Sequence, residues 1–253
     1  MPEPLYQIRG LTKRYGSRTV LEDLDFDLQR GECLVIIGRS GSGKSVTLRQ
    51  LNGLEKPDAG TVIFDGIDLT QLEERELFPI RRRLAMLFQS GALFDSMNVF
   101  DNVAFPLREH TKKPQKEIAE TVRHKLSLVN LKDKDVERKM PADLSGGMRK
   151  RVALARSLAL DPEVVLFDEP TTGLDPITSA TIGHLINSIQ KELGVTAVVV
   201  THDIPLARRV GDRLAFLHQG RFLFFGDWAE ADRSTEAELT GFLAGREEDE
   251  DAA

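Results

Sequence analysis

The sequence predicts an α/β fold: a mainly parallel sheet, an N-terminal antiparallel β subdomain and a helical subdomain inserted between strands. Short, continuous apolar runs at residues 34–37, 164–167 and 197–200 are typical of strands buried on both faces. Segments with helical spacing alternate with these runs, and this alternation favours a parallel sheet. Residues 91–160 lack β-branched runs, so they are expected to form the helical insertion.

The first part of the chain predicts strands around one helix. Residues 7–28 hold two apolar runs separated by turn residues, which indicates two antiparallel strands. A helix is expected from Lys44 to about Leu54, followed by a turn over residues 55–60. Further strands are expected at residues 61–64 and 84–88.

The second part adds helices and a closing hairpin. Within the expected helical subdomain, four apolar residues recur at helical spacing: Ile118, Val122, Leu126 and Val129. A helix is expected over Pro176–Leu193, with Asp175 as its N-cap and Pro176 at its first position. Residues 213–225 predict a hairpin that turns at Gln219 and Gly220.

Composition limits the classes of function. The 253 residues are 41% hydrophobic and 29% charged, which is ordinary for a globular protein, and neither a membrane span nor a signal peptide is expected. The single cysteine, Cys33, excludes an internal disulfide and is expected to be a small core residue. Five of the forty acidic residues are consecutive, Glu247 to Asp251, so the rest of the chain is nearly neutral. We therefore expect no nucleic-acid partner and an acidic, disordered tail over residues 246–253.

A phosphate-binding loop is predicted between the strand at residues 34–37 and the helix that begins at Lys44. The pattern G-x-x-x-x-G-K-[ST] matches there, and its strand-loop-helix context is the expected one. Glycines let successive backbone N–H groups point at phosphate oxygens, the helix N-terminus adds its dipole, and Lys44 reaches the β- and γ-phosphates. The residues expected to bind the nucleotide here are Gly38, Arg39, Ser40, Gly41, Ser42, Gly43, Lys44, Ser45 and Val46.

A pair of acids follows the apolar run at residues 164–167. Asp168 is placed where a carboxylate would hold Mg²⁺, to which Ser45 would also be a ligand. Glu169 comes directly after it and is the candidate base that orients and polarises the attacking water. The alternative is that both acids are surface charges.

Leu144-Ser145-Gly146-Gly147 resembles the signature motif of ABC ATPases, and a helix is expected after it, from about Met148 to Leu160. The resemblance covers residues 5–226 and implies the P-loop NTPase fold of the ABC type in one domain, residues 1–245, with its helical subdomain at about 91–160. It also implies that Ser145, Gly146 and Gly147 meet the ATP bound by the opposite subunit of a homodimer. The usual glutamine after the motif is Met148 here.

Four other positions match the family one by one. Tyr15 resembles the aromatic residue that stacks on adenine, and Gln89 resembles the glutamine that joins Mg²⁺ and water to the helical subdomain. Asp175, in Gly173-Leu174-Asp175, resembles the loop that crosses the dimer, and His202 resembles the histidine that contacts the γ-phosphate. The resemblance implies ATP as substrate, Mg²⁺ as cofactor, and catalytic roles for Lys44, Gln89, Glu169 and His202.

The segment from Phe88 to Glu109 is similar to ATPases of MCE/Mla-type phospholipid transporters. This similarity implies lipid transport between envelope membranes, a membrane permease, an MCE-domain protein, a small STAS-domain subunit and a peripheral place on the cytoplasmic face of the inner membrane. In such proteins the segment receives a permease helix. Four residues would give it an apolar surface, unless they pack internally: Phe94, Met97, Phe100 and Phe105. The basic triplets at residues 81–83 and 149–151 are expected to be solvated helix faces.

Three alternatives remain. An importer ATPase for amino acids or other small solutes would share every nucleotide motif. A soluble ABC protein of DNA repair or translation would usually carry two ATPase halves or a long coiled-coil insert, neither of which this sequence contains. A scaffold that binds ATP without hydrolysing it would not need Glu169 and His202.

Overall fold

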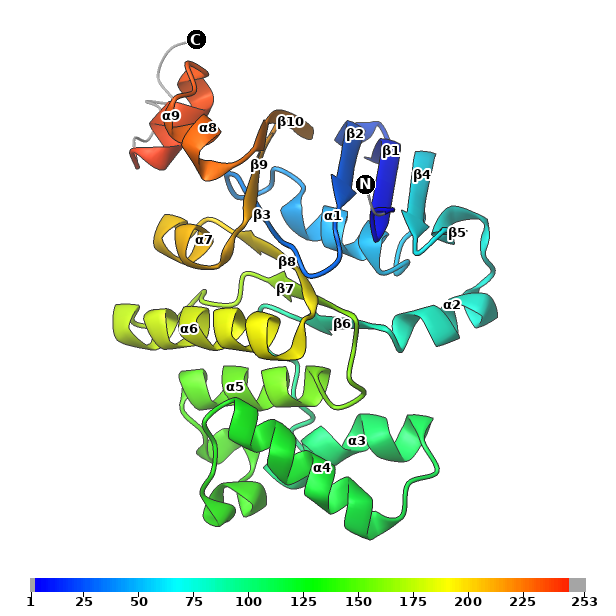
Figure 1. Ribbon diagram of the computed structural model, residues 1–253, viewed down its shortest axis with the longest axis vertical. Coiled ribbons are helices and arrows are strands. Elements are labelled where there is room, and N and C mark those ends of the chain that lie inside the picture. Colours follow the sequence, from blue (N-terminus) through cyan, green and yellow to red (C-terminus); the bar gives the residue numbers. More distant parts are fainter. Residues whose placement is uncertain (1–2, 246–253) are drawn as a thin grey trace. The chain divides into compact units, whose positions relative to one another are not determined.

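The computed structural model describes residues 3–245 (Figure 1). The contacts divide the chain into two compact units. The first unit joins Met1–Glu73 to Val198–Ala253, and the second is Glu74–Ala197. The expected acidic tail lies outside the described residues, and the boundaries expected for the domain and its helical subdomain stay a prediction.

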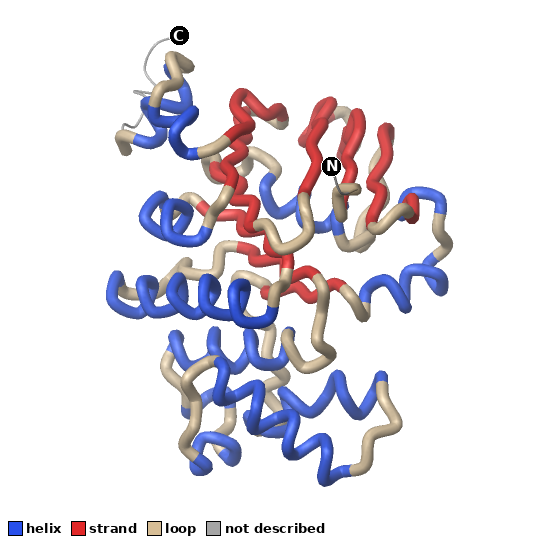
Figure 2. Tube along the Cα trace, in the orientation of Figure 1, coloured by secondary structure: helices blue, strands red, loops and turns tan. Residues whose placement is uncertain are grey.

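The first unit contains an antiparallel sheet with the strand order β2-β1-β4-β5, whose strands lie side by side in Figure 2. Its strands are β1 (Tyr6–Tyr15), β2 (Arg18–Leu28), β4 (Ala59–Phe64) and β5 (Ile67–Asp68). Tyr6 is fully buried, its ring centroid lies 4.9 Å from that of Phe64, and its hydroxyl donates to the carbonyl of Leu51 at 2.9 Å. The predicted antiparallel β subdomain is confirmed.

A second set of strands in this unit leads to the phosphate loop. Strand β3 (Cys33–Ile37) is buried along its whole length and pairs in parallel with β9 (Arg213–His218). Strand β10 (Arg221–Gly226) closes the expected hairpin with β9, and β8 (Thr196–Thr201) runs across the boundary between the units. Cys33 is buried, and burial raises the pKa of its thiol, as expected for a core residue. The helices of this unit are α1 (Lys44–Leu51), α7 (Ile204–Val210), α8 (Trp228–Asp232), α9 (Ala237–Leu243) and the 3₁₀ turn η1 (Leu69–Gln71).

The second unit is mostly helical around two parallel strands. Strands β6 (Leu84–Leu87) and β7 (Val164–Asp168) pair in register, with Leu84 opposite Val164 and Leu87 opposite Phe167. Helix α5 packs against α3, α4 and α6 (Figure 1). The helical elements are α2 (Glu74–Arg81), α3 (Val99–His110), α4 (Gln115–Leu128), η2 (Lys134–Arg138), η3 (Pro141–Asp143), α5 (Gly146–Ser157) and α6 (Pro176–Leu193).

The predicted strands and the helix over Pro176–Leu193 are confirmed, and Asp175 caps that helix by accepting from the backbone N–H groups of Ile177 and Thr178 at 3.0 Å. Helix α1 ends at Leu51 instead of Leu54, because the chain turns at the positive φ of Gly53. Helix α5 begins two residues earlier than expected because Ser145 is its N-cap.

Helix α2 is absent from the sequence expectations. Only two of its residues, Leu77 and Ile80, are buried, and Pro79 lies inside it, so its apolar pattern is too short to stand out. Within residues 3–245, no helix has the length and apolar character needed to cross a bilayer.

We expect Gly60→Ala to destabilise the first unit much more than Gly66→Ala. Both glycines have positive φ, +84° and +77°. A Cβ at Gly60 would lie 2.4 Å from the backbone of Arg9 and Gly10, whereas nothing lies within 4 Å of a Cβ at Gly66. The positive φ alone costs about 1 kcal/mol, and the backbone clash should raise the cost at Gly60 to about 3 kcal/mol. Denaturant unfolding of both variants measures the difference, and equal stabilities would contradict the prediction.

Candidate functional site

The loop between β3 and α1 surrounds the side chain of Lys44. Residues 38–43 connect the two elements, and Lys44 is the first residue of the helix. Its side chain folds back over the loop, where Nζ donates to the carbonyl oxygens of Gly38 at 2.8 Å and Arg39 at 3.1 Å. Lys44 is only 7% exposed. A buried ammonium at a helix N-terminus gives this loop a concentrated positive charge.

Two further features of the loop suit an anion. Gly43 is the N-cap of α1 and provides no side-chain oxygen for the N–H groups of the first turn. Among residues 3–245, the Ser42 hydroxyl is one of the few buried side-chain groups without a hydrogen-bond partner. Ser45 is partly exposed and Val46 is buried at the start of the same helix. The loop therefore offers a lysine, a hydroxyl and a helix N-terminus to a phosphate.

Tyr15 lies at the end of β1 with an exposed ring. The side chain is 45% exposed, its hydroxyl donates to Glu55, and Lys13 Nζ lies 5.5 Å from the ring centroid. Partial burial and the neighbouring Glu55 carboxylate raise the pKa of this phenol. The hydroxyl is held by Glu55, Lys13 lies over the ring, and the partly exposed ring has aromatic surface on which a base could stack.

His202 lies in the same unit as Lys44, directly after β8, and is exposed. The residues on either side of it are fixed. The Thr201 hydroxyl accepts from the backbone N–H of Asp203 at 3.0 Å, and the Asp203 carboxylate caps α7 by accepting from the N–H of Leu206 at 3.0 Å. This double capping holds the short turn that carries the imidazole.

In the second unit, Asp168 ends β7 and Glu169 follows it. Glu169 is 9% exposed and has a φ of +46°, a backbone conformation that a residue with a Cβ rarely adopts. The Thr172 hydroxyl donates to Oε2 of Glu169 at 3.3 Å, and the Thr172 N–H donates to its carbonyl oxygen at 3.3 Å. The carboxylate is therefore held in place by the turn that follows it, in a strained conformation typical of functional positions.

Gln89 lies two residues beyond the end of β6 and is exposed to solvent. Its carbonyl oxygen accepts a hydrogen bond from the buried ammonium of Lys150, which also lies 3.5 Å from the carbonyl oxygen of Glu169. The structure thus brings two of the predicted site residues, Gln89 and Glu169, to a single side chain. Lys150 is 6% exposed, so the expectation that its basic triplet is a solvated helix face is wrong for this residue.

The sequence does carry a signal for Lys150. Gly147, Lys150 and Leu154 follow helical spacing, and all three are buried on α5. A charge on the buried face of a helix indicates a specific partner. Because Lys150 stands between Arg149 and Arg151, the run of three basic residues hid this spacing.

The signature motif and the loop at Asp175 pack together in the second unit. Ser145 is exposed, and its Oγ accepts from the N–H of Met148 at 3.3 Å, which leaves the hydroxyl proton for another acceptor. A Cβ at Gly147 would lie 2.5 Å from Cγ2 of Thr178, so only glycine allows this approach of α5 to α6. The hydrogen bonds from Thr178 lower the pKa of Asp175 and keep it ionised.

The aromatic residues between Phe88 and Glu109 are partly exposed and also touch one another. The rings of Phe94 and Phe105 lie 4.8 Å apart, and the guanidinium of Arg156 lies 5.3 Å from the Phe94 ring. Phe94 is 41% exposed. Both expectations for this segment, an apolar surface and internal packing, therefore hold in part.

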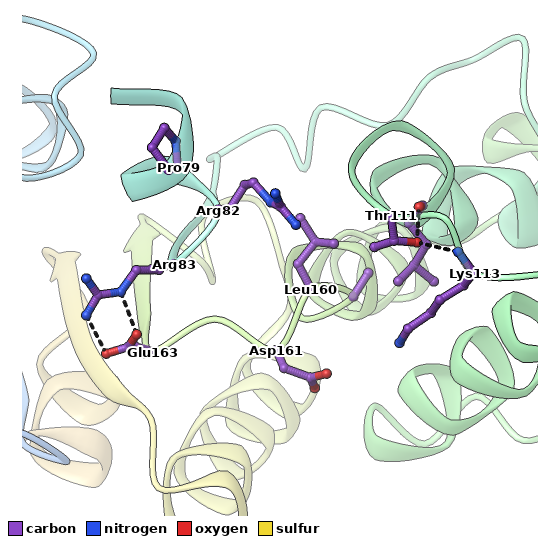
Figure 3. A pocket seen from close by; sticks show the side chains of 10 residues that line it. Pro79, Arg82, Arg83, Thr111, Lys113, Leu160, Asp161 and Glu163 are labelled. Carbon is purple, nitrogen blue, oxygen red and sulfur yellow. Dashed lines mark hydrogen bonds and ion pairs between the residues drawn. The ribbon is translucent and has the colours of Figure 1, made fainter. Parts of the chain in front are cut away.

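The expectation that the triplet at residues 81–83 is a solvated helix face is wrong for its last two residues, because α2 ends at Arg81 and each arginine has a partner. Arg81 pairs with Glu74, Arg82 donates to the His110 carbonyl at 2.9 Å, and Arg83 donates from Nε and Nη2 to the two carboxylate oxygens of Glu163. Figure 3 shows the last pair on the wall of a pocket of about 320 Å³, with Leu160, Thr111 and Lys113 also around it. The pocket is open and mixed in charge, and it holds none of the predicted site residues.

Comparisons with known proteins agree with these motifs. Residues 21–172 match the protein family described as "ABC transporter". The probable ribonucleotide transport ATP-binding protein mkl of Mycobacterium leprae is 45% identical over 240 residues, which are 95% of this chain and 69% of the relative. The intermembrane phospholipid transport system ATP-binding protein MlaF of Escherichia coli K12 is 40% identical over 241 residues, which are 95% of this chain and 89% of the relative.

A solved structure gives the same result for the fold. A dimeric ATP-binding cassette in a post-hydrolysis state, bound to ADP and Pi, aligns with a TM-score of 0.81 and 33% sequence identity over 88% of this chain and 98% of that chain. Its fold is the P-loop fold of the ABC type that the sequence predicts. On the family match and these relatives, the chain belongs to the ABC transporter family.

Proposed function

We propose that this chain is the ATP-hydrolysing subunit of an ABC transporter that moves phospholipid between the membranes of an envelope. One observation carries the proposal: the 40% identity to the phospholipid-transport ATPase MlaF extends over 95% of this chain and 89% of that protein. The similarity therefore includes the segment from Phe88 to Glu109 as well as the nucleotide motifs.

ATP is bound by the loop of the first unit. Lys44, with the N–H groups of residues 38–46 and the Ser42 hydroxyl, takes the phosphates, because a buried cation and a helix N-terminus both favour negative charge. The exposed ring of Tyr15 stacks on adenine. His202 contacts the γ-phosphate. The orphaned Ser42 hydroxyl and the low exposure of Lys44 support this assignment.

Hydrolysis depends on the acids of the second unit. Glu169 accepts a proton from the attacking water, and Gln89 orients that water. Ser45, Gln89 and Asp168 offer oxygen atoms, which Mg²⁺ prefers, and the ion would neutralise charge on the phosphates. The buried, hydrogen-bonded carboxylate of Glu169 supports its role as the base, because its position is fixed before substrate arrives.

Two copies of the chain act together. Ser145, Gly146 and Gly147 of one subunit contact the ATP bound by the other, and Asp175 lies in the loop that crosses between them. The remaining hydroxyl proton of Ser145 and the dimeric state of the aligned cassette support this assembly. ATP binding closes the dimer, and after hydrolysis the products repel each other and open it again.

The dimer works on the cytoplasmic face of the inner membrane with an integral permease. An MCE-domain protein and a small STAS-domain subunit are its further partners. The exposed part of Phe94 and the rest of its aromatic cluster provide the apolar surface for a permease helix.

A second cargo class has a specific observation in its favour. The Mycobacterium leprae relative, which is 45% identical, is named for ribonucleotide transport. A small-solute transporter would use the same ATP chemistry, so only the cargo and the permease separate the two proposals.

We expect Glu169→Gln to lower kcat for ATP hydrolysis by a factor of about 100 or more, because the amide cannot accept the proton from water. The variant should accumulate as an ATP-bound dimer, which size-exclusion chromatography with ATP measures. Glu163→Gln is the matched control, because Glu163 pairs with Arg83 directly before β7 and should leave hydrolysis unchanged. Normal turnover by a monomeric Glu169→Gln variant would refute the assignment of the base.

We expect the tagged chain, extracted from native membranes in mild detergent, to co-purify with a permease, an MCE-domain protein and phospholipid. Mass spectrometry identifies the proteins and lipids, and an untagged strain is the control. A permease with a solute-binding protein and no lipid would move the proposal to a small-solute transporter. Recovery with ribosomes or DNA and no permease would overturn the transporter proposal.

A further inference from the structure

The buried ammonium of Lys150 lies between the backbone segments that carry Gln89 and Glu169. It lies on α5, five residues after the signature serine Ser145, and is 6% exposed. Its Nζ donates to the carbonyl oxygen of Gln89 and lies 3.5 Å from that of Glu169. An ammonium has three N–H donors and no acceptor, so both carbonyl oxygens suit it.

The strand register explains why these two carbonyl oxygens lie together. Strands β6 and β7 pair in parallel with an offset that places Leu87 opposite Phe167. Continued by two residues, the same offset places Gln89 opposite Glu169. The strands have ended by then, because β6 stops at Leu87 and β7 at Asp168. Two residues beyond the last paired position, the Lys150 ammonium lies near the carbonyl oxygens of both segments, where the ladder of the two strands has ended.

The charge of Lys150 has a second consequence. Burial lowers the pKa of the ammonium, and the neighbouring carboxylates of Asp168 and Glu169 oppose that shift. A buried ammonium is costly unless it is paired and hydrogen-bonded. The two carboxylates and the two carbonyl oxygens therefore stabilise the buried ammonium together.

Glu169 is the residue that most needs such support. Its φ of +46° is unfavourable for a residue with a Cβ, and such a conformation persists only where surrounding contacts hold it. Thr172 holds the carbonyl and the carboxylate from the turn side, and Lys150 approaches the carbonyl from the helix side. A small error in the direction of the carboxylate is enough to reduce general-base catalysis.

We propose that Lys150 is a positioning residue for ATP hydrolysis, whose ammonium joins the carbonyl oxygens of Gln89 and Glu169 and so fixes the attacking-water machinery to the signature helix. The inference rests on the proposed role of Glu169 as the base. It adds a direct connection within one subunit, from the helix that begins at Ser145 to the residues after β6 and β7.

The test measures kcat, ATP affinity and melting temperature for the full chain, purified with the proteins that bind it. We expect Lys150→Met to lower kcat about tenfold, or about 1.4 kcal/mol of transition-state stabilisation, with the Kd for ATP within about twofold of the wild type. Lys150→Arg, which keeps charge and donors, should recover most of the loss. A loss that appears only in Kd would overturn the proposal.

Lys125→Met is the matched control. Lys125 is 2% exposed in the same unit and pairs with Asp161, away from Gln89 and Glu169. It should lower the melting temperature and leave kcat unchanged. If Lys150→Met does not fold, Lys150→Gln replaces it, because the shorter amide has no charge and cannot reach both carbonyl oxygens. Wild-type kcat in a folded Lys150→Gln variant would refute the proposal.

A double-mutant cycle separates positioning from general damage. In the Glu169→Gln background the base is already absent, so Lys150→Met should reduce the residual rate by less than twofold. An equal tenfold loss in both backgrounds would contradict positioning through Glu169. Normal hydrolysis by Glu169→Gln alone would instead refute the proposed base, and so the two failures are distinguishable.

Discussion

The parallel pairing of β6 with β7 is the constraint on which the second unit depends. Because Leu87 lies opposite Phe167, the polar residues that follow both strands emerge at the same edge of the pair. Neither Gln89 nor Glu169 needs to be placed by a loop of its own. Both strands are anchored by apolar residues, and the side chains of Val164, Val165, Leu166 and Phe167 are almost completely buried. A shift of this register by one residue would move both polar groups relative to each other and reverse the faces of the buried strand.

Buried charges and a strained backbone lie together at this edge, and the surrounding contacts must offset their cost in folding free energy. The ammonium of the buried Lys150 lies 3.5 Å from the carbonyl oxygen of Glu169, which is itself buried and has a positive φ. Each costs free energy alone, because a desolvated charge or a strained backbone is stable only with partners. The contact of Lys150 with the Glu169 carbonyl and the hydrogen bonds from Thr172 to Glu169 supply these partners. Natural proteins retain such clusters where function needs a fixed geometry.

The sequence was informative wherever one physical requirement dominated a segment. Apolar runs predicted β3, β7 and β8, because a strand buried on both faces needs apolar residues at every position. Asp175 and Pro176 marked the start of α6, because a capping carboxylate and a proline at the first position both favour a helix N-terminus. Helix α2 was missed because only Leu77 and Ile80 are buried, and Lys150 was missed because its charge resembles that of its exposed neighbours. Tertiary contacts decide these two cases, and a local pattern does not contain them.

Helix α5 joins the signature motif to the segment after Gln89 at two separate points. Lys150 binds the Gln89 carbonyl near the start of the helix, and two turns later Arg156 donates to the carbonyl oxygens of Gly91 at 3.1 Å and Ala92 at 2.8 Å. Arg156 also lies over the Phe94 ring at 5.3 Å. Any displacement of residues 89–94 must therefore either carry α5 with it or break several charge-assisted hydrogen bonds, each worth about 1.5–3 kcal/mol. Because Ser145 begins that same helix, a displacement of this segment that keeps these hydrogen bonds also moves the signature motif.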